Sequence, residues 1–380
     1  MKIFLSFLQS TINHPIPAYS FWEFYIKNGL EEAGINWVEE KEIDWAQGLV
    51  PQNKSELNAW KEKTWEKTLE SIKKEKPSIF LSYLYPQQID KTALKEIKKL
   101  GIYCVNFFCD NIRLFDKAPE EFSEFDLNWV PEYGAMNLYK QANFKAINLP
   151  MPMWVNPVFR MPSTIETDRI TFIGSKDIQR QLFFEKLIKL NPNLPLDIYG
   201  ASWDNIEPTK SALPTSLLKK YSNQLLFLKN QGLNAFINKL KFGSFNPQLS
   251  DEILKYLKGK PLFSEYIDLT RNSKITIGIN RYPSFKFPLY APNKYSRLRD
   301  IEAPMLGACY LTEWVEGMNN LYEVGNEIET FNSQEEFLEK VEMLEKDALL
   351  RKKLRLNGQK RALSDHSIMS SLKKIVDYLK

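Results

Sequence analysis

The sequence has few of the residues that build metal sites and disulfide frameworks. Its 380 residues include three cysteines and two histidines. Cys104, Cys109 and Cys309 lie in apolar, β-prone segments and lack the spacing of zinc ligands, so we expect buried free thiols. With His14 and His366 as the only imidazoles, a metal cluster built from Cys and His is not expected.

Long apolar runs and a dominant charge are missing as well. The apolar run 1–8 is too short for the core of a signal peptide or for a membrane span. We therefore expect a cytoplasmic protein without a transmembrane segment, while peripheral contact with a membrane stays open. The 51 basic and 47 acidic residues nearly cancel to a net charge of +4, which lacks the basic excess of a nucleic-acid-binding protein.

The composition that remains is that of a soluble globular protein with two domains. Hydrophobic residues make up 43% of the chain and charged residues 26%. A chain of 380 residues exceeds what one hydrophobic core usually supports. Pro150, Pro152, Pro157 and Pro162 interrupt both helices and strands and mark the linker. We predict an N-terminal domain at 1–155, a C-terminal domain at 156–365, and a terminal helix at 366–380 that packs back on the first domain.

Strand-like and helix-like segments alternate in both domains. In the first domain we expect strands at 2–8, 79–84, 102–108, 127–130 and 146–149, and helices near 19–33, 56–74, 92–99 and 132–142. Gly34 and Gly101 stand where helices should end with a positive φ. In the second domain we expect strands at 169–173, 196–199, 274–279 and 308–312, and a helix at 177–190. This alternation predicts two doubly wound α/β domains.

Two further segments of the second domain have distinct sequences. Ser333 and Glu336 have the spacing of a capping box in front of an amphipathic helix. The Lys- and Leu-rich segment 208–260 is longer than the usual connection between a strand and a helix, so we interpret it as a helical insertion.

The segment 293–312 carries the strongest candidate for a binding site. Arg297, Arg299 and Glu302 lie at an expected junction of loop and helix. Arginine pairs with phosphate oxygens, and a carboxylate accepts hydrogen bonds from ribose hydroxyls, so this combination suits a nucleotide diphosphate. The alternative is that Arg299 and Glu302, three residues apart, form a solvated ion pair on a helix surface.

Three other segments add candidates. Gly174 and Ser175 end an expected strand before a helix carrying Arg180, where backbone amides can bind phosphate, although a plain turn is the alternative. Asp197–Trp203 places Tyr199, Gly200 and Trp203 at the end of the next strand, with packing as the alternative for Trp203. The loop 281–294 holds three cations among aromatic residues and prolines, and could neutralise a diphosphate or be an ordinary surface loop. These cations are Arg281, Lys286 and Lys294.

The first domain offers two candidates for a general base. His14 follows the first expected strand, and Asp110 stands at the end of the strand 103–109. Loops at strand ends often carry function. The alternatives are a loop histidine without a role and a helix cap at Asp110.

The second half of the chain resembles a known family. Arg299, Glu302, Pro304 and Gly307, followed by LTE at 311–313 and LYEVGNEI at 321–328, resemble the CgeB-like, group 1 type glycosyltransferases. The turns at 174–175 and 197–203 resemble the same family. The similarity covers about residues 169–377.

The resemblance implies a GT-B fold, with two facing Rossmann-like domains and a deep interdomain cleft. It implies a nucleotide sugar in the second domain and an acceptor in the first. The residues implied for the donor are Gly174, Ser175, Arg180, Tyr199, Gly200, Trp203, Arg281, Arg297, Arg299, Glu302 and Thr312. No metal or other cofactor is expected, because the chain has no Asp-x-Asp motif. Related retaining enzymes carry a glutamate eight positions before the second one, where this chain has Lys294.

The function implied is a glycosyltransferase, hexosyl or related, acting in glycan biosynthesis. It would move a sugar from a nucleotide-sugar donor to a hydroxyl on a glycan, a lipid-linked oligosaccharide or a protein. The alternatives are a non-catalytic scaffold that binds a nucleotide and a nucleotide-sugar epimerase of the same fold.

Overall fold

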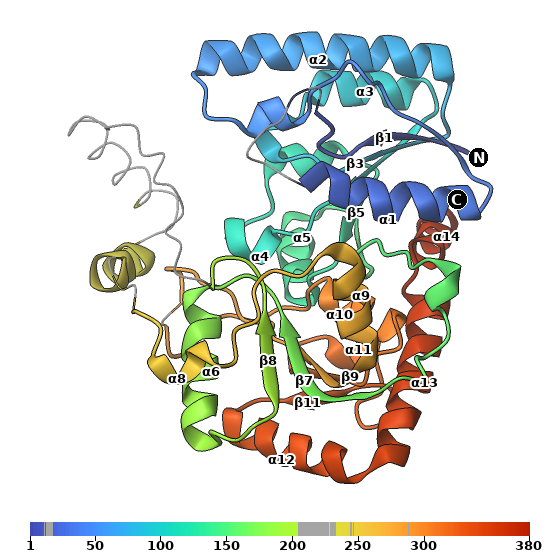
Figure 1. Cartoon of the computed structure of the whole chain (residues 1–380). Helices are drawn as coiled ribbons and strands as arrows, with labels where there is room; N and C mark the ends of the chain where they lie inside the picture. Colours follow the sequence, from blue (N-terminus) through green and yellow to red (C-terminus); the bar gives the residue numbers. More distant parts are fainter. Residues whose placement is uncertain are drawn as a thin grey trace. The chain divides into compact units, whose positions relative to one another are not determined.

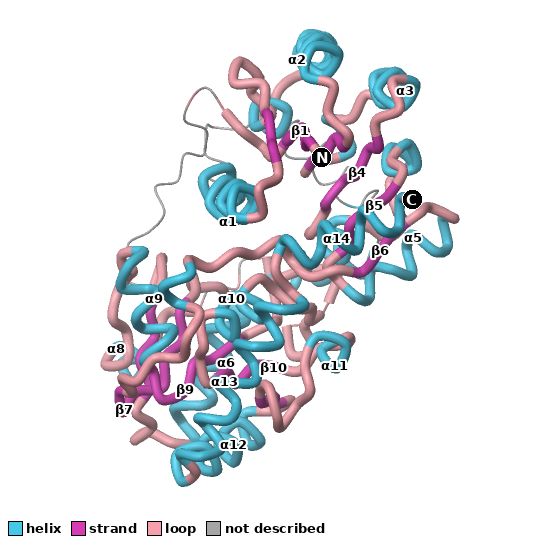
Figure 2. The backbone as a smooth tube through the Cα atoms, turned by 90° about the vertical axis from the view of Figure 1, so that its right-hand side faces the viewer, coloured by secondary structure: helices cyan, strands magenta, loops and turns pink. Residues whose placement is uncertain are grey.

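The chain forms two compact units, each described here by itself (Figures 1 and 2). The computed structural model describes residues 1–10, 12, 18–203, 228, 233–243, 245, 247–287 and 289–380. Unit 1 comprises Met1–Pro157 and Arg361–Lys380, and unit 2 comprises Val158–Lys360. The chain therefore enters unit 2 at the proline-rich segment and leaves it within the long helix α13 (Ala348–Asp365). About half of the helical insertion predicted at 208–260 lies outside the described residues.

Unit 1 is built on a six-stranded parallel sheet with the strand order β2-β1-β3-β4-β5-β6. Its strands are β1 (Lys2–Ser6), β2 (Asn36–Val38), β3 (Ile79–Ser82), β4 (Tyr103–Phe107), β5 (Leu127–Val130) and β6 (Ala146–Asn148). The five strands predicted from apolar runs are confirmed. The edge strand β2 was not predicted, because three residues with an exposed first position carry no periodic pattern.

The helices of unit 1 cover both faces of this sheet. They are α1 (Ala18–Glu32), α2 (Lys54–Glu75), α3 (Lys91–Lys99), α4 (Asn111–Leu114), α5 (Met136–Ala142) and α14 (Ile368–Leu379). Figure 1 shows α2 and α3 on one face and α1 on the other. Asn53 and Glu56 form a reciprocal capping box at the start of α2, and Asp90 caps α3. Gly34 and Gly101 have the positive φ predicted for them.

The terminal helix α14 packs on α1 within unit 1. A Cβ atom at Gly29 would lie 2.3 Å from the side chain of Ile368, so the two helices approach closely at a glycine. The backbone amide of Ile368 donates to the carbonyl of Met153 at 2.9 Å. His366, just before α14, is buried at 3% exposure. These contacts explain why the last residues of the chain belong to unit 1.

Unit 2 is built on a five-stranded parallel sheet with the strand order β11-β10-β9-β7-β8. The strands are β7 (Thr167–Ile173), β8 (Leu196–Tyr199), β9 (Ser273–Gly278), β10 (Tyr310–Glu313) and β11 (Glu329–Phe331). The labelled helices are α6 (Ile178–Leu190), α8 (Asp251–Leu254), α9 (Phe263–Asn272), α10 (Arg299–Met305), α11 (Met318–Leu321) and α12 (Gln334–Lys346), followed by α13. The four strands and the first helix predicted for this unit are confirmed. The edge strand β11 was not predicted, because it is as short as β2 and has no periodic pattern.

The core of unit 2 lies between the sheet and the helices α6 and α12. The ring of Phe183 on α6 lies 5.7 Å from that of Phe331 and 6.1 Å from that of Phe337. Ser333 caps α12 by accepting from the amide of Glu336, as predicted. The reciprocal bond of the capping box was predicted wrongly, because the Glu336 carboxylate accepts from the amide of Asn332 instead.

Two other features complete the description. Short 3-10 helices occur at Ala46–Leu49, Pro86–Gln88, Glu120–Glu124, Tyr133–Ala135 and Pro157–Phe159. The three cysteines are free and buried, which confirms the prediction made for them. Within the described part of the chain, we find no helix whose length and apolar character would suffice to cross a bilayer.

Candidate functional site

Three guanidinium groups meet at the carboxyl edge of the unit 2 sheet, where the turn after β7 lies beside the start of α10. Arg299 Nη2 donates to the carbonyl oxygen of Ile173, the last residue of β7, at 3.1 Å. Arg180 Nη1 donates to the carbonyl oxygen of Ser175 in the same turn at 2.7 Å. The guanidinium of Arg297 lies 5.1 Å from the ring centre of Tyr295. We call Arg180, Arg297 and Arg299 the arginine cluster.

The arginine cluster concentrates positive charge, which is neutralised in part by Asp177, whose Oδ2 lies 3.4 Å from Arg180 Nε. The pKa of Arg180 is lowered to about 10, mainly by burial; Asp177 opposes this shift, and the charges of Arg297 and Arg299 contribute to it. Among the described residues, the Nε atom of Arg297 is buried without a hydrogen-bond acceptor. A buried donor without an acceptor is unfavourable, so an anion that supplied several oxygens would stabilise this site.

Glu302 lies beside the cluster and is held by a tyrosine. The hydroxyl of Tyr266 on α9 donates to Glu302 Oε2, and the guanidinium of Arg299 lies 4.6 Å from the centre of the same ring. Glu302 is 4% exposed. The alternative of a solvated surface pair for Arg299 and Glu302 is therefore wrong, since the carboxylate is buried in the side-chain network.

A second buried carboxylate, Asp300, fixes the segment that carries these arginines. Asp300 is fully buried and accepts hydrogen bonds from the amide of Arg297 at 2.9 Å and from the hydroxyls of Tyr310 and Thr312 at 2.8 and 2.9 Å. Asn280 donates to it at 3.3 Å. Burial raises the pKa of Asp300, and these hydrogen bonds oppose that shift. The turn before α10 is thus tied to the ends of β9 and β10.

Gly278 makes this network possible. A Cβ atom at Gly278 would lie 2.1 Å from the Tyr310 hydroxyl and 2.2 Å from Thr312 Oγ1. Both hydroxyls therefore occupy the space that any larger residue would need. The hydroxyl of Thr312, which was predicted to contact the donor, is fully buried and bonded to Asp300, so we assign it to the support of the site instead.

Two of the three cations of the loop 281–294 share a carboxylate partner. Arg281 forms an ion pair with the buried Glu313, and Lys294 Nζ lies 2.8 Å from Glu313 Oε1. Burial would raise the pKa of Glu313, but the hydrogen bond from Arg281 and the charges of both cations lower it. Arg281 was predicted to bind the donor, and this pairing shows that its charge is already compensated.

The turns after β7 and β8 touch through two glycines. Gly200 has φ 145°, and a Cβ atom there would lie 2.1 Å from the carbonyl oxygen of Gly174. The indole Nε1 of Trp203 donates to that same oxygen at 2.8 Å. Because Trp203 is 1% exposed and packs against Phe184, the structure supports the packing alternative and not a contact with the donor.

The structure brings together six of the predicted donor residues. Tyr199 ends the neighbouring strand β8, and Gly200 follows it in the turn that touches Gly174, while Trp203, Arg281 and Thr312 serve packing or support. The six are Gly174, Ser175, Arg180, Arg297, Arg299 and Glu302. Sequence reasoning missed three residues. Glu313 belongs to the LTE segment at 311–313, but no role was predicted for it. Asp300 lies between Arg299 and Glu302 and was not predicted as a site residue. No sequence pattern indicated Tyr266.

The predicted base Asp110 lies at the carboxyl edge of the unit 1 sheet. Its Oδ2 atom accepts from the hydroxyl of Tyr85 at 3.0 Å and from that of Tyr83 at 3.4 Å. Arg113 Nη1 lies 4.0 Å from Oδ1. Asp110 occupies the N-cap position of α4, as the alternative predicted, but its side chain makes no capping hydrogen bond. The other predicted base, His14, lies outside the described residues.

A buried glutamate caps α4 in place of Asp110. The carboxylate of Glu132 accepts from the backbone amides of Asn111 and Ile112 at 2.8 and 3.3 Å. Burial raises the pKa of Glu132 to about 8, and these hydrogen bonds reduce the shift. Tyr139 donates to the Asn111 side chain at 2.8 Å, so the end of β4 and the start of α4 are held in one geometry.

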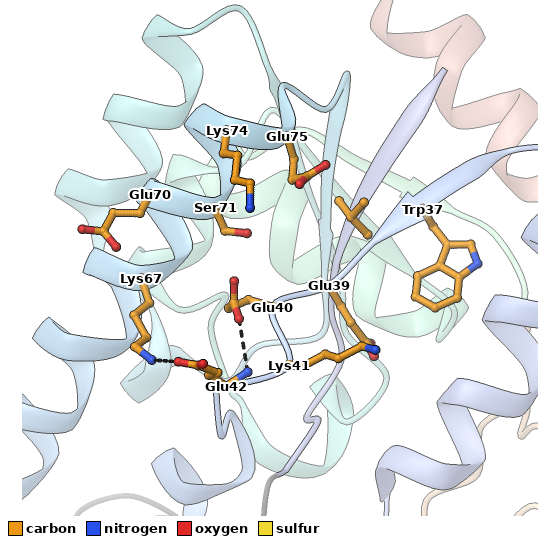
Figure 3. Close-up of a pocket in the computed structure, with 11 residues that line it drawn as sticks. Trp37, Glu39, Glu40, Lys41, Glu42, Lys67, Glu70, Ser71, Lys74 and Glu75 are labelled. Carbon is orange, nitrogen blue, oxygen red and sulfur yellow. Dashed lines mark hydrogen bonds and ion pairs between the residues drawn. The ribbon is translucent and has the colours of Figure 1, made fainter.

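Unit 1 also has a charged surface hollow of about 520 Å³ (Figure 3). It is formed by the end of β2, the loop that follows and one side of α2. Part of its charge is paired: Lys67 pairs with Glu42, as Figure 3 shows, and Glu39 pairs with Lys27 outside the lining. Lys2 pairs with Glu75 in the same way. Since these charges compensate each other at an exposed position, the hollow is a weaker candidate than the arginine cluster.

Comparison with known proteins agrees with the geometry. Residues 252–377, about a third of the chain, match a family model described as glycosyl transferase-like. This match includes α10, with Arg299 and Glu302, and the buried Glu313. No curated protein gives a significant sequence match.

Several solved structures match the whole chain. A glycosyltransferase from Rickettsia africae matches with a TM-score of 0.58 and 12% identity, covering 100% of this chain and 98% of that one. Sucrose-phosphate synthase from Thermosynechococcus elongatus matches with a TM-score of 0.56 and 10% sequence identity, and the match covers 100% of this chain and 98% of that one. Anabaena Alr3699/HepE, solved in complex with UDP, matches with a TM-score of 0.55 and 10% sequence identity, and the match covers 100% of this chain and 99% of that one. At this identity the matches show the fold, that of GT-B glycosyltransferases with two Rossmann-like domains, and the family match supports a glycosyltransferase.

Proposed function

We propose that this protein is a cytoplasmic glycosyltransferase of the CgeB-like group that acts in glycan biosynthesis. It moves a sugar, a hexose or a related one, from a nucleotide-sugar donor to a hydroxyl on a glycan, a lipid-linked oligosaccharide or a protein. The observation that carries the proposal is the arginine cluster, Arg180, Arg297 and Arg299, at the carboxyl edge of the unit 2 sheet. Ligands of open α/β sheets bind at this edge.

In this proposal the arginine cluster binds the diphosphate of the donor. Charge develops on the diphosphate as the bond to the sugar breaks, and donors already in place stabilise that charge without reorganisation. Arg180 and Arg299 bracket the Gly174–Ser175 turn. The amide of Gly174 donates to the carbonyl of Tyr199, so in this proposal the backbone amide of Ser175 acts on the anion together with the two side chains. Three guanidinium groups provide the positive charge that a metal ion supplies elsewhere, and we therefore propose a reaction independent of metal.

Glu302 accepts hydrogen bonds from the ribose hydroxyls of the donor. Tyr266 holds one of its carboxylate oxygens and leaves the group oriented beside the arginine cluster. Lys294, which stands where related retaining enzymes carry another glutamate, is bound to Glu313. This supports a site in which one carboxylate, and not two, faces the donor.

We propose a uridine nucleotide as the donor and Asp110 as the base. Anabaena Alr3699/HepE was also solved in complex with UDP-glucose, and its fold is similar to that of this chain. In an inverting transfer, Asp110 takes the proton of the acceptor hydroxyl, whose oxygen then bonds to the anomeric carbon. The bond from that carbon to the diphosphate oxygen breaks, and its electron pair leaves with the nucleotide.

Calorimetry with the purified protein tests this proposal. We expect UDP to bind in the presence of EDTA, and the variants Arg299→Gln and Arg180→Gln to bind it at least ~10-fold more weakly, as for the loss of a charge-assisted hydrogen bond. Lys189→Gln changes the net charge equally at an exposed position of α6 and should bind UDP normally. Absence of binding for UDP, GDP, TDP and CMP alike would refute the donor site.

A second ligand tests Glu302 separately. The variant Glu302→Gln should lose affinity for UDP but lose little for 2′-deoxy-UDP, because the missing hydroxyl already removes part of the interaction. Equal losses for both ligands would show that Glu302 does not contact the 2′-hydroxyl.

Lys294 in place of a glutamate also favours a second candidate, a non-catalytic scaffold that binds the nucleotide without turnover. Slow hydrolysis of the donor by the native protein, absent from Arg299→Gln, would exclude it. A nucleotide-sugar epimerase would convert the donor sugar when no acceptor is present, and product analysis detects that conversion.

A further inference from the structure

A short helix at 233–242 in unit 2, drawn in olive in Figure 1, is amphipathic. On its inner side Ala235 is 1% exposed, and Asn238 Nδ2 donates to the carbonyl oxygen of Phe285 at 3.0 Å. Phe242 lines a hollow beside α6. The helix is therefore attached to unit 2 through one face.

The other face of this helix is apolar and exposed. Leu233, Ile237 and Leu240 are 64%, 39% and 63% exposed. Their spacing of four and three residues places them in one stripe along the helix. Single exposed apolar residues are common on soluble proteins, but an aligned stripe marks a surface that binds something.

The apolar surface continues beyond the helix. Phe245 is 46% exposed and Tyr290 is 86% exposed, and both line the same hollow of about 820 Å³ as Phe242. A second hollow of about 210 Å³ shares Phe242 and Phe245 with the first and adds Phe287. We call Leu233, Ile237, Leu240, Phe245 and Tyr290 the apolar patch.

The sequence that carries the apolar stripe is basic. Lys239 and Lys241 belong to the helix itself. The sequence from 208 to 250 contains six lysines and no Asp or Glu, although the whole chain carries only four more positive than negative charges. An apolar stripe with basic neighbours, and with no carboxylate along the same segment, matches the chemistry of an anionic lipid surface.

We propose that the apolar patch binds the surface of an anionic bilayer. The leucine and isoleucine side chains enter the boundary between headgroups and acyl chains, and the lysines lie among the lipid phosphates. Tyrosine is enriched at this boundary because its ring is apolar and its hydroxyl is polar, which suits Tyr290. The inference concerns residues other than those of the arginine cluster and requires no nucleotide.

Flotation with lipid vesicles tests this inference on the full chain. We expect the protein to float with vesicles that contain phosphatidylglycerol and not with vesicles of phosphatidylcholine alone. High salt should weaken the binding, because it screens the lysines. The double variant Ile237→Glu with Leu240→Glu should reduce the floated fraction at least ~5-fold, and Lys239→Gln with Lys241→Gln should reduce it to a smaller extent.

The matched control is the double variant Leu349→Glu with Leu356→Glu. These leucines are 80% and 45% exposed on α13 of the same unit, so the charge change is the same. Their spacing of seven residues again places both on one side of a helix. The control should float like the native protein, and all variants should keep the native melting temperature. The inference is overturned if the native protein ignores anionic vesicles, if it binds both lipid mixtures equally, or if the control loses as much binding. Light scattering that shows a dimer converted to a monomer by Ile237→Glu with Leu240→Glu would overturn it as well, by assigning the patch to self-association.

Discussion

The hydroxyl of Tyr266 donates a hydrogen bond to the buried carboxylate of Glu302. The ring of the same tyrosine lies against the guanidinium of Arg299. One side chain from α9 therefore positions both an acidic and a basic member of the proposed donor site on α10. The hydroxyl therefore acts on Glu302 and the ring on Arg299, so the two contacts can be tested separately.

The variant Tyr266→Phe should keep the ring and lose the hydrogen bond to Glu302. We expect the free energy of unfolding to fall by about 1–2 kcal/mol and the affinity for UDP to fall by up to ~10-fold, because the carboxylate loses its fixed orientation. Tyr256→Phe is the matched control, since its hydroxyl donates to the carbonyl of Pro192 at 2.6 Å in the same unit. The control should lose similar stability in urea unfolding but keep its affinity in calorimetry. Equal losses of affinity would contradict a role for Tyr266 in the site.

The variant Gly200→Ala should destabilise unit 2 and weaken UDP binding. A Cβ atom at this position would collide with the carbonyl of Gly174, and the positive φ is itself unfavourable for alanine. We expect a loss of roughly 2–5 kcal/mol from the two effects together. Gly259 has a φ of 81°, but no atom lies within 4 Å of a Cβ added there. The variant Gly259→Ala should therefore lose only the stability that the positive φ costs an alanine. Equal melting temperatures of the two variants would show that the close contact is absent.

The variant Asp110→Asn should reduce sugar transfer by ~10²–10⁴-fold, the usual contribution of a general base. UDP affinity should not change, because Asp110 belongs to unit 1. Tyr85→Phe removes a hydrogen bond to the base and should reduce transfer by up to ~10-fold. Asp90→Asn, which preserves the cap of α3, serves as the control. Transfer at the native rate by Asp110→Asn would point to another base.

The stability of unit 1 should depend on pH through Glu132. Its pKa is raised to about 8 in the folded protein by burial, above its value of 4.5 when unfolded. The folded state therefore binds the proton more tightly, and this stabilisation is complete below pH 4.5 and is lost as the pH rises toward 8. In the native protein, we expect the free energy of unfolding measured in urea to fall by on the order of a few kcal/mol between pH 5 and pH 8, and the variant Glu132→Gln should no longer show this fall. The control variant Glu62→Gln, at an exposed position, should keep the pH dependence of the native protein. An unchanged pH dependence in Glu132→Gln would show that another group is responsible.

Much of the fold could be read from local patterns along the chain. Buried parallel strands are continuous apolar runs, and helices begin and end at recognisable capping residues. The two edge strands, β2 and β11, were missed because three residues carry no period. Their pairing depends on neighbouring strands that are remote in sequence.

The sequence by itself determined the chemical groups of the candidate site, since Arg297, Arg299 and Glu302 are neighbours on one short segment. It could not distinguish these arginines from Arg281, because the pairing of a charge depends on what the fold places beside it. The tertiary structure pairs Arg281 with Glu313, buries Trp203 beneath a turn, and places Tyr266 between Arg299 and Glu302. Burial and neighbouring charge decide whether an ionisable side chain is already satisfied or available to a ligand, and both are properties of the folded chain.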